Sequence, residues 1–119
     1  VVVVSTPLNQ GTRGMVNRSL LSKFKGTYIV NVARAEVVDK DDMLKFLKDN
    51  PEKFYFSDVW WGEPELTVPI PENAMLTPHV GGFTEKTLRD ATLKACENVK
   101  RFLEGHPENV VDLGDYGRP

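Results

Sequence analysis

Short apolar runs, separated by polar stretches, recur along the chain as far as residue 77. They fall at residues 1–5, 27–32, 54–59 and 74–77 and are rich in Val, Ile, Phe and Tyr. Runs of this length and composition, bounded by Pro, Gly and Asn, are typical of β-strands. Because they are apolar almost throughout rather than alternating, they predict the buried strands of a parallel sheet, covered on both faces.

The segments between these runs have helical spacing and begin with residues that cap helices. Helices are predicted at residues 17–24, 41–50 and 84–104, and residues 33–38 are predicted to form a connecting loop. The predicted caps are Asn17, then Asp39 or Asp41, and finally Thr84. Strands that alternate with helices in this way predict an α/β fold, a parallel sheet with crossover helices, followed by one long helix and a tail.

Composition limits the class of protein. The 119 residues carry a formal net charge of −2, which implies neither a nucleic-acid partner nor an anionic membrane surface. No run is long enough for a membrane span. The single cysteine, Cys96, allows no internal disulfide and fits a reducing compartment, so we expect a cytoplasmic protein and place Cys96 in the core.

The chain opens on an apolar strand, VVVV. A central strand needs neighbours on both sides, and a strand at the very start of the chain would lack one of them. We therefore expect the sequence to be a piece of a longer chain with its start missing.

Candidate chemistry gathers where the predicted strands end. Arg34, Asp58 and His79 each lie at or just after such an end, and Glu63 lies in the proline-rich loop between the last two. Ligands of open parallel sheets bind beyond the carboxyl ends of the strands, so these side chains are expected to face one crevice. An arginine fork suits a carboxylate or phosphate, and a histidine suits proton transfer near neutral pH.

Each of these residues also has a purely structural interpretation. Arg34 could pair with Glu36 or Asp39 at the surface, and His79 could be a solvated loop residue. If Glu63 contacts His79, it orients the ring and favours its protonated form; otherwise it is a surface glutamate. Asp58 needs a partner, either a helix N-terminus or a ligand donor.

Several other residues are given no chemical role. Trp60 and Trp61 could stack on a flat ring, but packing beneath the loop is the favoured interpretation. No metal-ligand spacing occurs, so no metal site is predicted.

Three motifs resemble those of a known family. The segment IVNVARAEVVDKDDML resembles the second signature of the D-isomer-specific 2-hydroxyacid dehydrogenases, the family of formate, glycerate and phosphoglycerate dehydrogenases. The segments FSDVWWGEP and LTPHVGG together resemble the third signature, and STPLNQGTRGMVN resembles the loop that precedes both. All three occur in the family's order.

The resemblance implies part of a Rossmann-type sheet and a hydride transfer between a nicotinamide cofactor and a 2-hydroxy or 2-keto acid. Arg34 would bind the substrate carboxylate, His79 would be the acid/base, and Glu63 would hold and polarise His79. Asp58 would accept a hydrogen bond from the nicotinamide carboxamide. The other residues implied to line the cofactor are Pro7, Leu8, Asn9, Gln10, Gly11, Val32, Ala33, Gly81 and Gly82.

The resemblance also implies how the chain is divided. Residues 1–83 would be the C-terminal half of the NAD(P)-binding domain, residues 84–105 a connecting helix, and residues 106–119 a tail that returns to the substrate domain. The cofactor that the resemblance implies is NAD. The glycine-rich phosphate turn is not in this sequence, so NADP stays open and the chain alone is expected to be inactive. A homodimer, or association with the missing N-terminal portion, is implied.

Two questions about function follow from the resemblance. Formate dehydrogenases of the family carry glutamine where Glu63 stands, so Glu63 favours a hydroxy acid substrate. The alternative from another class is a non-catalytic, NAD-sensing interaction protein of the corepressor type, which has the same fold and similar Arg, Glu and His residues.

Overall fold

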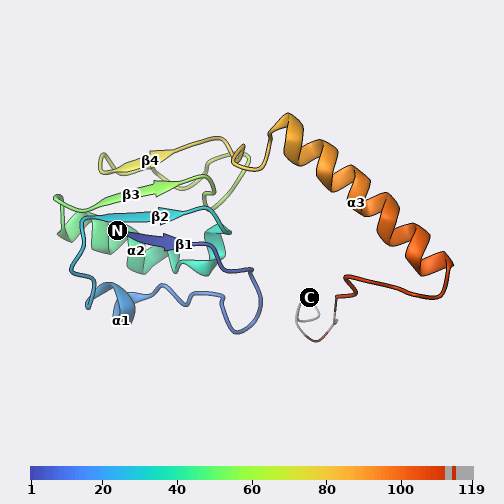
Figure 1. Ribbon diagram of the computed structural model, residues 1–119. Coiled ribbons are helices and arrows are strands. Elements are labelled where there is room, and N and C mark those ends of the chain that lie inside the picture. Colours follow the sequence, from blue (N-terminus) through green and yellow to red (C-terminus); the bar gives the residue numbers. More distant parts are fainter. Residues whose placement is uncertain (112–113, 115–119) are drawn as a thin grey trace. The chain divides into compact units, whose positions relative to one another are not determined.

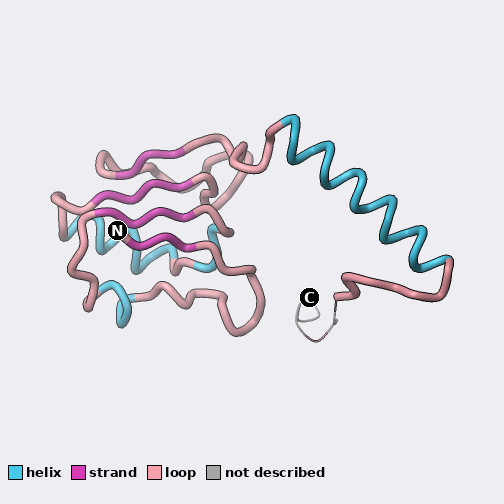
Figure 2. Tube along the Cα trace, viewed as in Figure 1, coloured by secondary structure: helices cyan, strands magenta, loops and turns pink. Residues whose placement is uncertain are grey.

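Four short strands form one parallel sheet (Figures 1 and 2). The computed structural model describes residues 1–111 and 114, and the chain divides into two compact units, Val1–His79 and Val80–Pro119. The strands lie side by side in chain order: β1 (Val2–Val4), β2 (Tyr28–Asn31), β3 (Phe54–Ser57) and β4 (Ala74–Leu76). Every neighbouring pair is parallel, so all four carboxyl ends lie at one edge. The predicted α/β fold with a parallel sheet is confirmed.

Two helices follow the first two strands, α1 (Arg18–Leu21) and α2 (Lys40–Asp49). Each begins at a predicted cap, because the side chain of Asn17 accepts two backbone N–H groups of α1 and that of Asp39 accepts one of α2. Asp39, and not Asp41, therefore caps α2. Capping satisfies backbone donors that the first turn of a helix leaves without partners.

Two connections complete the first unit. Residues 33–38, expected as a loop, contain the single 3-10 turn η1 (Ala35–Val37). The connection from β3 to β4, residues 58–73, contains the prolines of the predicted loop, and its Glu63–Pro64 peptide bond is cis.

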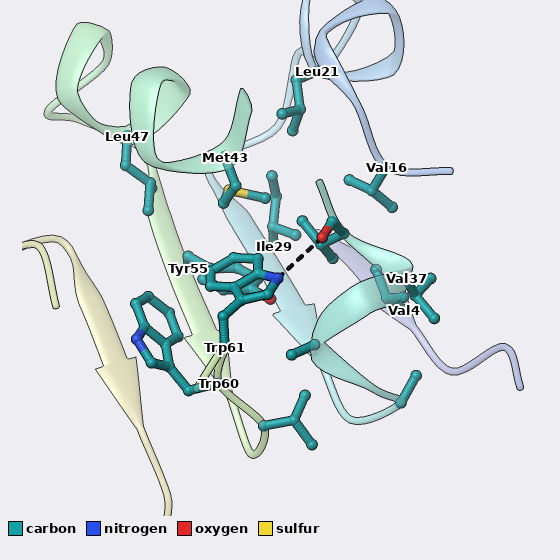
Figure 3. Close-up of a cluster of buried hydrophobic side chains, with 14 residues drawn as sticks. Val4, Val16, Leu21, Ile29, Val37, Met43, Leu47, Tyr55, Trp60 and Trp61 are labelled. Carbon is teal, nitrogen blue, oxygen red and sulfur yellow. Dashed lines mark hydrogen bonds between the residues drawn. The ribbon is translucent and has the colours of Figure 1, made fainter. Parts of the chain in front are cut away.

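The core of this unit lies between the sheet and the helices (Figure 3). Met43 and Leu47 of α2 are buried against strand residues that include Ile29 and Tyr55. The register of β2 and β3 explains which strand residues meet in the core. Ile29 is paired with Tyr55, and two residues further along, Asn31 is paired with Ser57. All four of these strand residues are buried.

The expectation that the strands are buried on both faces is wrong for the described part of the first unit. Val3 is 57% exposed and Met75 is 64% exposed, and both belong to the outward-facing row of the sheet. The physical reason is that the helices of this unit bury only the row containing Ile29 and Tyr55. As a result, buried residues alternate with exposed or half-buried residues along β2 and β3.

The second unit is built on the long helix α3 (Glu85–Leu103). Thr84 caps it by accepting from the backbone N–H of Thr87, and Gly105, with φ of 80°, follows its end. No residue of α3 is buried, so Cys96 is exposed, and its expected place in the core is wrong. Most of the tail after residue 111 lies outside the described residues. Among the helices of the described residues, none has the length and apolar character to cross a membrane.

Candidate active site

Four loops leave the same edge of the sheet, and each carries residues predicted to bind a ligand. Pro7 follows β1, Arg34 follows β2, Asp58 follows β3 and His79 follows β4. Since the strand order equals the chain order, the loops also follow one another along that edge. This is the edge at which open parallel sheets bind ligands.

The predicted contact between Glu63 and His79 is present. His79 Nδ1 lies 2.8 Å from Glu63 Oε2, and the side chains are 48% and 29% exposed. The other carboxylate oxygen of Glu63 accepts the backbone N–H of Trp60, so both oxygens are held. An ionised carboxylate can only accept, so Nδ1 carries the proton of this hydrogen bond and Nε2 is left for a ligand.

The backbone has positive φ at His79 and at Gly62, the residue before Glu63. His79 has φ of 54°, in the left-handed region that residues other than glycine rarely adopt, and its N–H donates to the carbonyl of Thr77 over 2.9 Å. Gly62, which precedes Glu63, has φ of 80°, and a Cβ there would lie 2.3 Å from Thr67 Oγ1. Unusual backbone held in place by its surroundings is a feature of functional sites.

Arg34 forms no ion pair within residues 1–111 and 114, so the structural interpretation that paired it with Glu36 or Asp39 is not supported. Its Nη1 donates to the carbonyl of Ala33 over 2.7 Å, and the residue is exposed. Of the two neighbours predicted to line a cofactor, Val32 is 55% exposed at the edge of the sheet, whereas Ala33 is 7% exposed and belongs to the core.

Asp58 is half-buried, and its carboxylate accepts from the hydroxyl of Thr77 at the end of β4. A neighbouring hydroxyl is a partner that the sequence did not suggest. The backbone N–H of Asp58 donates to the carbonyl of Asn31 over 3.0 Å, which ties the start of this loop to β2.

The first loop forms a turn through its own side chains. Asn9 Oδ1 accepts from the backbone N–H groups of Gly11 and Thr12 at 2.9 and 3.0 Å. Thr12 Oγ1 donates to the carbonyl of Pro7 over 2.6 Å. The predicted cofactor segment 7–11 is therefore held in one shape, whereas Gly81 and Gly82 belong to the second unit.

Trp60 and Trp61 pack beneath the loop, as the favoured interpretation held (Figure 3). Their rings lie 6.0 and 6.2 Å from the ring of Tyr55, centroid to centroid, and Trp61 Nε1 donates to the carbonyl of Val38. A cavity of about 430 Å³ opens beside the Glu63–His79 pair, with Trp60 in its wall.

Three buried polar residues behind this edge were missed by sequence reasoning. Asn31 is 0% exposed, Ser57 is 5% and Tyr55 is 0%, and their side chains form hydrogen bonds with one another and with the loops. The sequence contained a signal for two of them. Asn31 and Ser57 are polar residues at the ends of otherwise apolar strands, which could have marked them as part of the site.

The parallel sheet with its crossover helices is a Rossmann-like α/β fold, and the loops at its carboxyl edge carry a guanidinium, a carboxylate and a histidine–glutamate pair. The family model described as D-isomer specific 2-hydroxyacid dehydrogenase, NAD binding domain, matches residues 1–81. The chain therefore belongs to the D-isomer-specific 2-hydroxyacid dehydrogenase family, as the motifs indicated.

Several proteins are similar to this chain along most of its length. It is 33% identical over 134 residues to the formate dehydrogenase of Chaetomium thermophilum, covering 98% of this chain and 35% of that protein. The solved glycerate dehydrogenase related protein from Thermoplasma acidophilum is 48% identical, with a TM-score of 0.67 over 86% of this chain and 37% of that one.

A further solved structure contains a nicotinamide nucleotide. The D-isomer specific 2-hydroxyacid dehydrogenase from Xanthobacter autotrophicus Py2, in complex with NADPH and MES, is 34% identical to this chain, with a TM-score of 0.79. The match covers 93% of this chain and 47% of that one. The chain spans about a third of the length of the curated relatives it matches.

Proposed function

We propose that the protein is an NAD(P)-dependent oxidoreductase that interconverts a D-2-hydroxy acid and its 2-keto acid. The observation that carries this proposal is the hydrogen bond between His79 Nδ1 and Glu63 Oε2, 2.8 Å long. A histidine held in this way has one ring nitrogen committed to the carboxylate and the other free to exchange a proton. Hydroxy acid oxidation requires such an exchange at the substrate hydroxyl.

The residues at this edge of the sheet fit a nicotinamide. Asp58 offers carboxylate oxygens at the end of β3, the type of acceptor that a carboxamide N–H₂ needs. Val32 presents an exposed apolar side chain at the end of the neighbouring strand, against which a flat ring could lie. When bound, a nicotinamide cofactor accepts a hydride from the hydroxy acid or supplies one to the keto acid.

Arg34 is proposed to bind the substrate carboxylate. Its exposed guanidinium forms no ion pair within the described residues, so binding a carboxylate would cost no existing pair there. A planar fork can grip the acid group with two hydrogen bonds and so orient the carbon that exchanges the hydride.

His79 and Glu63 are proposed to act as one unit. In reduction of the keto acid, negative charge develops on the carbonyl oxygen, and His79 Nε2 delivers a proton to it. Glu63 accepts from Nδ1 throughout, so the imidazolium is stabilised while it carries the proton. In oxidation, Nε2 takes the proton from the hydroxyl.

Glu63 also bears on the choice between hydroxy acid and formate, because several curated relatives are formate dehydrogenases. Formate loses a hydride to give carbon dioxide without a proton exchange, so a carboxylate beside the histidine would be superfluous. The Glu63–His79 hydrogen bond thus supports a hydroxy acid substrate.

The test is a substrate survey of the protein at its natural length. Oxidation of NADH and of NADPH is followed with glyoxylate, pyruvate and hydroxypyruvate, and reduction of NAD⁺ is followed with formate. We expect turnover of at least one keto acid. Turnover of formate alone would refute the proposed substrate class, and the preferred nucleotide follows from the ratio of kcat/KM values.

The same survey separates the proposal from the non-catalytic alternative. Tight NADH binding, measured by fluorescence, together with negligible turnover of every acid would favour an NAD-sensing interaction protein of the corepressor type. We further propose a cytoplasmic homodimer: one cysteine suits a reducing compartment, and the dimer is what the family resemblance implies. Cell fractionation and sedimentation equilibrium test these two points.

A further inference from the structure

Two polar side chains occupy the last positions of neighbouring strands, inside the core. Asn31 ends β2 and Ser57 ends β3, they are paired in register, and they are 0% and 5% exposed. Burying amide and hydroxyl groups is unfavourable unless they are hydrogen-bonded, whereas apolar residues there would avoid that cost. Their polar character therefore needs a reason other than packing.

The amide of Asn31 holds the backbone of the Arg34 loop on both sides. Its Oδ1 accepts the N–H of Ala33 over 2.9 Å, and its Nδ2 donates to the carbonyl of Arg34 over 3.1 Å. One side chain thus holds the Val32–Ala33 and Arg34–Ala35 peptide groups, which enclose Ala33 and Arg34. The direction in which the guanidinium leaves the sheet depends on these peptide groups.

Ser57 holds the Asp58 loop in the same manner. Its Oγ donates to the carbonyl of Val59 over 2.6 Å and lies 3.3 Å from the N–H of Val59. Asp58 lies between Ser57 and Val59. Its own backbone N–H donates to the carbonyl of Asn31 over 3.0 Å. Its carboxylate is thereby aimed by the same cluster.

Tyr55 links the two anchors. Its hydroxyl accepts from Asn31 Nδ2 over 3.0 Å and lies 3.4 Å from Ser57 Oγ. Tyr55 is 0% exposed, and burial raises the pKa of its hydroxyl, which therefore stays protonated. The described residues contain no buried side-chain N or O atom that lacks a hydrogen-bond partner, so this cluster is satisfied.

We infer that Tyr55 and Asn31 are positioning residues, which set the Arg34 and Asp58 loops relative to each other for joint binding of substrate carboxylate and nicotinamide. The inference rests on the proposed function. Because the Tyr55 hydroxyl joins the two loops, removing it should misalign Arg34 and Asp58 while the ring stays packed on Trp60 and Trp61. A small displacement of the guanidinium that grips the substrate carboxylate can lower the reaction rate greatly.

The test compares Tyr55→Phe with a matched control in the protein at its natural length. The control is Asn73→Ala, because Asn73 Nδ2 donates to the carbonyls of Leu47 and Lys53 at 3.0 and 2.9 Å, before β3 and away from the site edge. For Tyr55→Phe we expect kcat/KM for the acid to fall about tenfold. For Asn73→Ala we expect kcat/KM to change by less than about twofold. Its loss of thermal stability should be comparable to that of Tyr55→Phe.

A second comparison asks whether Tyr55 acts through Arg34. In an Arg34→Ala background, Tyr55→Phe should lower kcat/KM by clearly less than the tenfold expected in the wild type, because there is no guanidinium left to position and only the Asp58 loop is still affected. Fully additive effects would overturn the inference, as would equal losses of kcat/KM for Tyr55→Phe and Asn73→Ala.

Hydrogen–deuterium exchange supplies a measurement that does not depend on turnover. Peptides covering residues 31–37 and 57–61 should exchange faster in Tyr55→Phe than in the wild type, and Asn73→Ala should leave them unchanged. Unchanged exchange in both segments of Tyr55→Phe would overturn the inference. If the wild type turns over no acid, the proposed function fails, and the exchange data alone decide whether the cluster holds the loops.

Discussion

Replacing Glu63 with glutamine tests the acid/base pair with very little change of shape. Glutamine has the same shape but only one acceptor oxygen where glutamate has two, so it cannot accept both the N–H of Trp60 and the Nδ1–H of His79 as Glu63 does, and it has no charge. A hydrogen bond to a charged group is worth about 1.5–3 kcal/mol. His79 and Glu63 are 48% and 29% exposed, so solvent screening selects the lower end, about 1.5 kcal/mol. This corresponds to roughly a tenfold loss of kcat.

The prediction is specific for reactions that exchange a proton. With a 2-keto acid and NADH, Glu63→Gln should lower kcat about tenfold, because without the carboxylate the imidazolium that delivers the proton is less favoured relative to the neutral ring. If the wild type oxidises formate, the rate of that reaction in Glu63→Gln should stay within about twofold of the wild-type rate, because carbon dioxide forms without proton transfer. Initial rates from NADH absorbance measure both reactions.

Glu65→Gln is the matched control, since Glu65 is exposed in the same loop and its substitution removes the same charge. It should leave both reactions within about twofold of the wild type. Equal losses for keto acid and formate, or no loss for either, would refute the role given to Glu63. So would an equal loss in Glu65→Gln.

Three further predictions concern the stability of the protein and, for the first, its turnover as well. Gly62→Ala should lower the melting temperature and keto acid turnover together, because φ of 80° and the nearby Thr67 side chain leave no room for a Cβ beside Glu63; wild-type values for both would contradict this. Met43→Ala should lower the free energy of unfolding in urea by about 2–5 kcal/mol, because the side chain is fully buried; a loss below about 1 kcal/mol would contradict close packing there. Burial raises the pKa of Tyr55 in the folded state, so its contribution to stability is complete below about pH 10 and is lost as pH rises further. Urea unfolding should therefore show a steeper loss of stability above about pH 10 in the wild type than in Tyr55→Phe; equal slopes would contradict it.

The order and type of the elements could be predicted from the sequence because their causes are local. Asn17, Asp39 and Thr84 cap helices by bonding the backbone within their own first turns. Strand burial was predicted less well, because an apolar run does not show which of its two faces the helices of the same unit cover. The exposure of Val3 and Met75 is the consequence.

The site was predicted in part. Glu63 and His79 were expected to meet, and their atoms lie 2.8 Å apart. The hydroxyl of Thr77 as the partner of Asp58 was not expected. The Glu63–His79 contact could be predicted because a recognisable motif contains both residues. The contact between Thr77 and Asp58 could not, because it depends on how β3 and β4 align.

The sequence by itself determined that this chain is a parallel α/β protein of a hydroxyacid dehydrogenase family, with Arg34, Asp58 and His79 at strand ends. Capping, alternation of elements and motif order are properties of neighbouring residues, and they can be seen without a fold. Only the tertiary structure decided that Asn31, Tyr55 and Ser57 form one buried cluster behind those residues. Residues 31 and 55 meet because β2 and β3 pair in one particular register, and register is set by packing across the whole sheet.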